Sequence, residues 1–181
     1  MKVSSMGVTR LQRRYLLPIY LLVAFYLDGA ISHLCEQWLY TPDHTLISRL
    51  FMLVLVVTAF VLPEERQLTW YAAGIGLLYD LYYTGMIGMY TFAVPLIIYT
   101  VRYLKQYLPD SAFFIGLIDV LCLTLLESTI YIMNRLIGYA TVTPVEFISN
   151  VLAPTIALNL VYFVFLYLPL KYLLLKLKSE R

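Results

Sequence analysis

The sequence predicts an all-α polytopic membrane protein with six transmembrane helices and both termini in the cytoplasm. Of its 181 residues, 61% are hydrophobic and 13% are charged, against about 45–50% and about 25% in soluble proteins. The mean hydropathy is +0.79. A soluble domain of this length cannot bury so much apolar surface, so lipid is the expected solvent. The pattern of apolar segments and the placement of Lys and Arg supply the rest of the prediction.

Six apolar segments are candidates for spans, since about 20 helical residues cross a bilayer core of about 30 Å. The segments are 15–33, 46–62, 67–83, 86–101, 112–134 and 151–170. The third and fourth lie between Arg66 and Arg102, a stretch whose only charge is Asp80 and which is too long for one helix. Its turn signal is Thr84-Gly85. We therefore expect a tight hairpin of two short spans, or a partly re-entrant one.

Basic residues gather on one side of these spans, which is the cytoplasmic side by the positive-inside rule. Only Arg49 and Arg135 fall on the other side, near helix ends where long side chains reach the interface. The remaining 11 of 13 are Lys2, Arg10, Arg13, Arg14, Arg66, Arg102, Lys105, Lys171, Lys176, Lys178 and Arg181. Both termini are therefore expected in the cytoplasm, which requires an even number of spans.

The domain organisation follows from these boundaries. We expect one membrane domain, 15–175, between basic cytoplasmic tails at 1–14 and 176–181. The first helix is expected to remain uncleaved, because Ala30-Ile31-Ser32 is a poor signal-peptidase site. The loops are too short for a soluble catalytic module. We expect no catalytic residues, no cofactor, no metal site and no nucleic-acid partner.

Charged residues inside the predicted spans are candidates for function, because charge in a bilayer is costly and normally faces protein or water. The topology places Asp28, Arg49, Asp80 and Glu127 towards the external leaflet, where they form a predicted intramembrane polar cluster. The alternative is that each caps a helix end or reaches the interface separately.

The fifth segment carries a polar stripe that helical periodicity places on one inward face. It is either an ordinary seam between helices or part of a solute or proton path. Its members are Asp119, Leu123, Leu126, Glu127, Ile130 and Asn134.

Three enzymatic patterns are incomplete. Tyr79-Asp80 is like the first half of an intramembrane aspartyl protease pair, but the second half, a Gly-x-Gly-Asp, is absent. Glu64-Glu65 lacks the arginine of prenyl-protease-like enzymes. His33 and His44 have no ligand spacing that supports a metal site. The sequence therefore favours a protein that is not an enzyme.

Two motifs carry a family resemblance. The first is Gly76-Leu77-Leu78-Tyr79-Asp80-Leu81, followed by Gly85, Gly88 and Tyr90-Thr91-Phe92. The second, in the last segment, combines Leu152-Ala153-Pro154, Asn159 and Tyr162-Phe163. Together they resemble the rod shape-determining protein MreD family, and the length and the six helices fit nearly the whole chain.

The resemblance implies a non-enzymatic scaffold subunit of the cell-wall elongation (rod) machinery in the bacterial cytoplasmic membrane, multi-pass and embedded in the lipid bilayer. It implies an MreC-like bitopic partner and, indirectly, the MreB filament, RodZ, RodA and a class B penicillin-binding transpeptidase. Small residues allow close helix approach. The expected partner-binding residues are Gly76, Asp80, Gly85 and Gly88, and the last-helix family positions are Pro154 and Asn159.

The alternative function is a substrate-binding S component of an energy-coupling-factor vitamin transporter, a class to which the MreD family is similar in fold. The predicted polar cluster would then line an outward-facing pocket. The usual Ala-x-x-x-Ala contact of the first helix is missing, since Ala24 is followed four residues later by Asp28. Ala153 and Ala157 have the spacing, but in the last helix.

Overall fold

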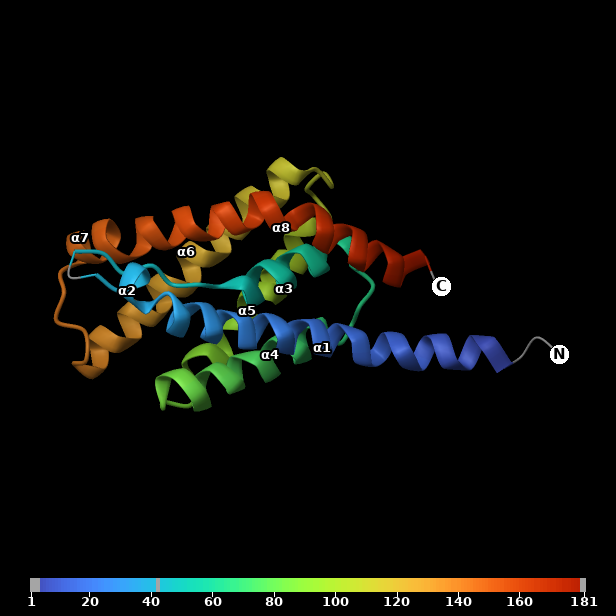
Figure 1. The fold of residues 1–181 in the computed structure, drawn as a ribbon, viewed down its shortest axis with the longest axis horizontal. Helices are drawn as coiled ribbons and strands as arrows, with labels where there is room; N and C mark the ends of the chain where they lie inside the picture. The colour runs from blue at the N-terminus through green and yellow to red at the C-terminus, as the bar shows by residue number, and fades with distance from the viewer. Residues whose placement is uncertain (1–3, 42, 180–181) are drawn as a thin grey trace.

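The computed structural model describes residues 4–41 and 43–179, and every element in this part of the chain is helical (Figure 1). Residues 1–3 and 180–181 of the predicted tails lie outside the described residues. An isolated bridge joins Tyr40 and Thr45. The all-α class is confirmed. The elements are α1 (Ser4–Leu34), α2 (Glu36–Leu39), α3 (Leu50–Val61), α4 (Leu68–Tyr79), η1 (Asp80–Thr84), α5 (Met89–Lys105), α6 (Ala112–Ile137), α7 (Pro144–Phe147), η2 (Ile148–Leu152) and α8 (Ala153–Ser179), where η1 and η2 are π-helical.

Each of the six predicted segments overlaps one α-helix of the structure, namely α1, α3, α4, α5, α6 and α8 in chain order. Among the described residues, three helical stretches are long and apolar enough to cross a membrane: Leu16–Leu34, Ala112–Ile137 and Pro144–Leu177. α3 is a shorter apolar helix. Crossing by the other three segments stays a prediction, as do the cytoplasmic termini and the similarity in fold to transporter S components.

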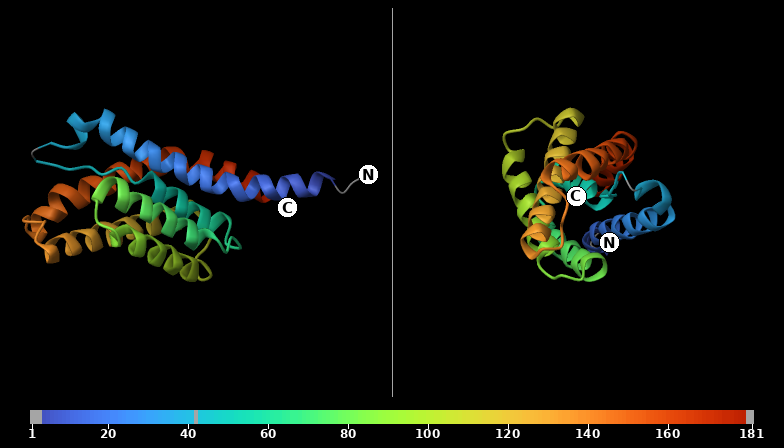
Figure 2. Two further views of the ribbon diagram at one scale, coloured as in Figure 1. Left: turned by 90° about the horizontal axis from the view of Figure 1, so that it is seen from below. Right: turned by 90° about the vertical axis from the view of Figure 1, so that its left-hand side faces the viewer.

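The long helices run up and down along one axis of the molecule (Figures 1 and 2). α1 begins and α8 ends at the same end, where the α3–α4 and α5–α6 loops also lie (Figure 1). We call this the basic end, and the opposite end, with α2 and α7, the far end. α3 forms the centre of the bundle: all its residues are buried, and it contacts α1, α4, α5, α6 and α8.

The predicted helix over 46–62 is wrong in its first part. Residues 46–49 form no helix, and α3 begins only at Leu50. At 1.5 Å per residue its 12 residues measure about 18 Å, well short of a bilayer core. The chain therefore enters the bundle from the far end in extended form. Backbone of this kind is tolerated in a membrane only where protein satisfies its polar groups.

The predicted hairpin is present as α4, η1 and α5. α5, the fourth of the predicted helices, begins at Met89 instead of residue 86. Gly85 (φ 67°) and Gly88 (φ 119°) adopt left-handed conformations, which end the preceding helix and delay the start of α5. The two helices pack closely. A Cβ added at Gly76 would overlap the backbone carbonyl of Tyr90, so a larger side chain would separate them.

Candidate functional site

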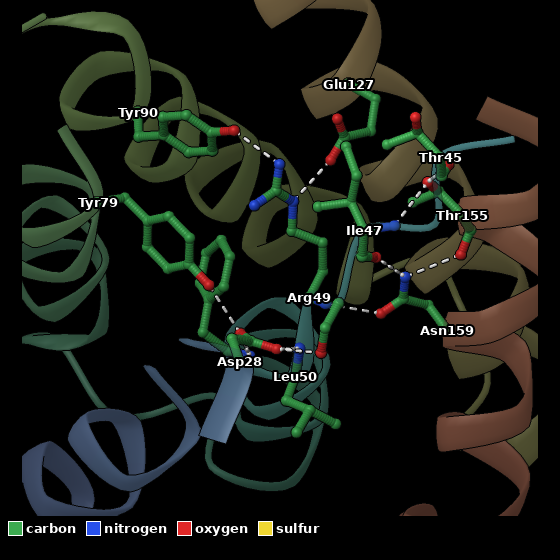
Figure 3. A network of polar contacts seen from close by, with 12 residues as sticks. Asp28, Thr45, Ile47, Arg49, Leu50, Tyr79, Tyr90, Glu127, Thr155 and Asn159 are labelled. Atoms are coloured by element: carbon green, nitrogen blue, oxygen red, sulfur yellow. Dashed lines mark hydrogen bonds and ion pairs between the residues drawn. The ribbon is translucent and has the colours of Figure 1, made fainter. Parts of the chain in front are cut away.

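Buried polar side chains converge on the start of α3 (Figure 3). They come from helices far apart in sequence and bond to one another and to the backbone of the extended segment. We call this set the core polar network. It consists of Asp28 of α1, Ser48 and Arg49 before α3, Tyr79 of α4, Tyr90 of α5, Glu127 of α6, and Thr155 and Asn159 of α8.

Asp28 caps α3 from a different helix. One carboxylate oxygen accepts hydrogen bonds from the Ser48 hydroxyl at 2.6 Å and the Leu50 amide at 2.7 Å. The other accepts the Phe51 amide at 3.1 Å and the Tyr79 hydroxyl at 2.8 Å. The first amides of a helix have no partner within it and carry partial positive charge. The buried carboxylate therefore satisfies groups that lipid could not.

Arg49 is held by a carboxylate and two aromatic rings. Its Nε donates to Glu127 Oε1 at 2.6 Å, and the two side chains are only 6% and 3% exposed. Its Nη2 donates to the Tyr90 hydroxyl at 2.6 Å. The guanidinium also lies 5.5 Å from the ring centroid of Tyr79 and 5.1 Å from that of Tyr90. Such distances give cation–π attraction, which is strongest without water.

Asn159 of α8 holds the extended segment by both ends of its amide. Its Oδ1 accepts the Arg49 backbone amide at 2.9 Å, and its Nδ2 donates to the Ile47 carbonyl at 2.8 Å. One turn earlier, the Thr155 hydroxyl accepts the Ile47 amide at 3.1 Å and donates to the Thr45 carbonyl at 3.4 Å. These side chains replace the partner strand that an extended segment normally requires.

Pro154 explains a further contact of this segment. Proline has no N–H, so the carbonyl four residues earlier, on Asn150, lacks its usual helical donor. The Thr45 amide donates to that carbonyl at 2.7 Å. The interruption at η2 and Pro154 thus provides an acceptor for the entering chain. Pro154 and Asn159, the two family positions of the last helix, serve the same segment.

Asp80 caps α5 across the hairpin and is fully buried. Its Oδ1 accepts the Tyr90 amide at 2.9 Å. Its Oδ2 accepts the Gly88 amide at 2.7 Å, the Thr91 amide at 3.0 Å and the Thr91 hydroxyl at 2.6 Å. An asparagine amide would turn a donor group towards at least one of these donors, so the site is built for a carboxylate.

The four residues of the predicted cluster therefore have separate tasks. Arg49 and Glu127 form an ion pair, and Asp28 lies beside them in the core polar network (Figure 3). Asp80 bonds to its own hairpin instead. Gly76, Gly85 and Gly88 shape that hairpin by close packing and left-handed backbone.

The stripe on α6 points inward over most of its length. Asp119, Leu123, Leu126, Glu127 and Ile130 are buried, whereas Asn134 is half-buried. Asp119 Oδ1 has no hydrogen-bond partner among the described residues. Within residues 4–41 and 43–179, no group of three or more His, Cys, Asp or Glu side chains is placed to hold a metal ion.

Sequence reasoning missed Ser48 and Thr155. Two local signals could have found them. Ser48 closely precedes an apolar helix, as capping residues do. Thr155 and Asn159 are four residues apart, which places both on one face of α8.

These features define a class: a helical membrane protein whose buried polar groups hold an extended segment and a central helix in place. Comparison with known proteins gives the family. The rod shape-determining protein MreD family matches residues 10–177. The rod shape-determining protein MreD of Bacillus subtilis (strain 168) is 31% identical over 169 residues, which is 93% of this chain and 97% of the relative. The chain belongs to the MreD family, and membership supports a role in rod shape determination. No solved structure matches it.

Proposed function

We propose that this protein is a non-enzymatic scaffold subunit of the bacterial cell-wall elongation machinery, located in the cytoplasmic membrane, where it supports cell shape and peptidoglycan synthesis. The observation that carries the proposal is the use of its buried charges. Asp28, Arg49, Asp80 and Glu127 all bond to groups of the protein itself. Charges used in this way fix the positions of helices, as a scaffold requires.

The transporter alternative has no support from the comparisons. It also needs a polar pocket lined by the predicted cluster. A cavity of the described residues lies elsewhere, between α1, α3 and α8, and its lining is apolar apart from Tyr20. A vitamin-like solute with polar groups would find few partners there.

The proposed partner is an MreC-like bitopic protein, through which the subunit would act with MreB, RodZ, RodA and a class B transpeptidase. The α4–α5 hairpin is the proposed contact. Gly76 and Asp80 are buried within it, and the exposed Gly85 and half-buried Gly88 form its turn, so that all four would set its shape. The exposed side chains Tyr82, Ile87 and Phe92 would then make the contact with the partner.

Recovery of the partner tests this proposal. Phe92→Ala should reduce co-purification of an MreC-like partner severalfold without affecting membrane insertion, because Phe92 is 75% exposed and supports little internal packing. Phe165→Ala on α8 is the matched control, since Phe165 is 73% exposed, and it should leave recovery unchanged. Normal partner recovery and normal cell shape with Phe92→Ala and Ile87→Ala would exclude the hairpin as the contact.

A further inference from the structure

An apolar cleft of about 350 Å³ opens between α1 and α8, with the start of α3 as its floor. The lining includes Ala24 and Leu27 of α1, Leu53 of α3, and Pro169 and Leu173 of α8. Figure 1 shows α1 and α8 on either side of α3 along this part of the bundle. The cleft is separate from the proposed hairpin contact.

The lining of the cleft suits a hydrocarbon chain. The cleft opens at the surface between two helices and is lined by aliphatic side chains and Tyr20. A flexible acyl chain can adapt to such an apolar lining and bury its surface there.

The length and polarity of the cleft match one leaflet. Lys176 follows Leu173 by three residues and Pro169 by seven, so these positions share a face of α8. Leu166, which also lines the cleft, lies ten residues before Lys176, or about 15 Å along the helix. That distance is half of a bilayer core of about 30 Å. A lipid with its tail in the cleft would have its headgroup level with Lys176.

The surrounding charge selects the headgroup. Between Ser4 and Leu27, α1 contains three arginines and no acidic residue, and between Leu160 and Ser179, α8 contains three lysines and no acidic residue. Lys171 is bonded to Tyr167 on its own helix at 3.1 Å. Lys176 is exposed and follows Leu173, which lines the cleft, by about one turn of α8. A phosphate-bearing anion complements this excess of positive charge.

We propose that the cleft binds one anionic diacyl phospholipid from the leaflet at the basic end. One acyl chain lies between α1 and α8, and the headgroup phosphate lies beside Lys176. Apolar contact with Ala24, Leu53 and Leu173 holds the tail, and charge distinguishes this lipid from zwitterionic ones. This binding site is independent of the proposed partner contact.

Native mass spectrometry of the purified full chain, titrated with dioleoyl phosphatidylglycerol or dioleoyl phosphatidylcholine, tests the headgroup. The wild type should retain one phosphatidylglycerol and prefer it to phosphatidylcholine. Lys176→Gln should lower that preference about fivefold, the effect of one basic residue near an anionic lipid. Lys105→Gln is the matched control, because Lys105 pairs with Asp110 in the α5–α6 loop away from the cleft. Lys105→Gln should leave the preference for phosphatidylglycerol unchanged.

A second pair of variants tests the tail. Ala24→Phe adds a ring to the wall of the cleft and should reduce binding of both lipids. Val161→Phe adds the same ring at an exposed position of α8 that does not line the cleft, and binding should persist. The proposal would be overturned if the wild type retained the two lipids equally, or if Lys176→Gln kept the wild-type preference for phosphatidylglycerol. Unchanged lipid binding by a folded Ala24→Phe would also overturn it.

Photo-crosslinking in intact membranes identifies the occupant without disturbing the fold. Val23 lines the cleft and is half exposed, so a benzophenone side chain there should couple to phospholipid. Coupling to another protein, or to a second copy of this chain, would place a helix over the cleft and contradict the proposal. This result also decides the matter if Ala24→Phe does not fold.

Discussion

Asp28 and Asp80 perform the same task at two places in the bundle. Each is a buried carboxylate on one helix that accepts amide hydrogen bonds at the start of another: Asp28 at α3 and Asp80 at α5. A helix start carries partial positive charge, so each acid is stabilised there as an anion without a basic side chain. The single buried base, among the described residues, is then available to Glu127. Three of the four buried acids are thereby compatible with one base in an apolar interior, while the fourth, Asp119, has an oxygen without a hydrogen-bond partner among the described residues.

The Arg49–Glu127 ion pair leads to a prediction at this scale. Arg49→Leu leaves Glu127 buried without its cation, and breaking a buried pair in this way costs about 3–5 kcal/mol. We expect a loss of that order in the free energy of unfolding, measured in detergent by thermal or denaturant unfolding. Arg49→Lys should lose less, since it keeps the charge while giving up the second donor to Tyr90.

A double substitution is the control for this prediction. Arg49→Leu with Glu127→Leu removes both charges, and replacing a buried pair by apolar residues is often close to neutral. The double variant should therefore be more stable than Arg49→Leu alone. Equal unfolding of wild type and Arg49→Leu would show that the pair contributes nothing to stability.

At the scale of elements, the entry into α3 is the feature that local sequence could not predict. Residues 46–62 form one apolar run, and hydropathy alone predicts a helix through all of it. The helix is stopped by partners more than 100 positions away, Thr155 and Asn159, which bond to Ile47 and Arg49. A local window can single out Ser48 or Thr155 as polar residues, but it cannot show which residues more than 100 positions away they contact. The hairpin, in contrast, was predictable because Thr84-Gly85 encodes its turn locally.

The candidate site was likewise predictable only in part. Sequence identified Asp28, Arg49, Asp80 and Glu127 as residues that normally face protein or water, because the cost of charge in lipid is a property of the residue type. It could not assign their partners, which depend on how α1, α4 and α6 are arranged around α3. The close approach at Gly76 was foreseen from residue size, but its neighbour is Tyr90 of the same chain.

Asn159→Asp tests whether the Asn159 side chain holds the extended segment before α3 in place. Aspartate has nearly the same shape but cannot donate to the Ile47 carbonyl, so an acceptor is left unpaired in the core at a cost of about 1–3 kcal/mol. Amide hydrogen exchange at Ile47 and Arg49 should become at least about fivefold faster through easier local opening. Thr129→Val is the control, because the Thr129 hydroxyl bonds only within α6. An unchanged rate of amide exchange at Ile47 and Arg49 in Asn159→Asp would contradict this role of Asn159.

At the scale of the whole molecule, the fold gathers the basic residues that the sequence predicts on one side. The start of α1, the end of α8 and the two loops with Arg66, Arg102 and Lys105 all lie at the basic end (Figure 1). Arg102 also donates to the Pro63 carbonyl at 3.4 Å and to Thr69 at 3.4 Å. These contacts join the end of α5 to the α3–α4 loop and to the first turn of α4.

This arrangement predicts an orientation. Basic residues near spans are retained in the cytoplasm, so the basic end should face it and the far end should face outwards. Reporter proteins fused before Met1, after Arg181 and within the α5–α6 loop at Asp110 should all report the cytoplasm. A reporter inserted after Tyr139, in the loop between α6 and α7, should report the exterior. Opposite locations for the two termini would require an odd number of spans, and an exterior signal at Asp110 would mean that α5 does not return to the basic side.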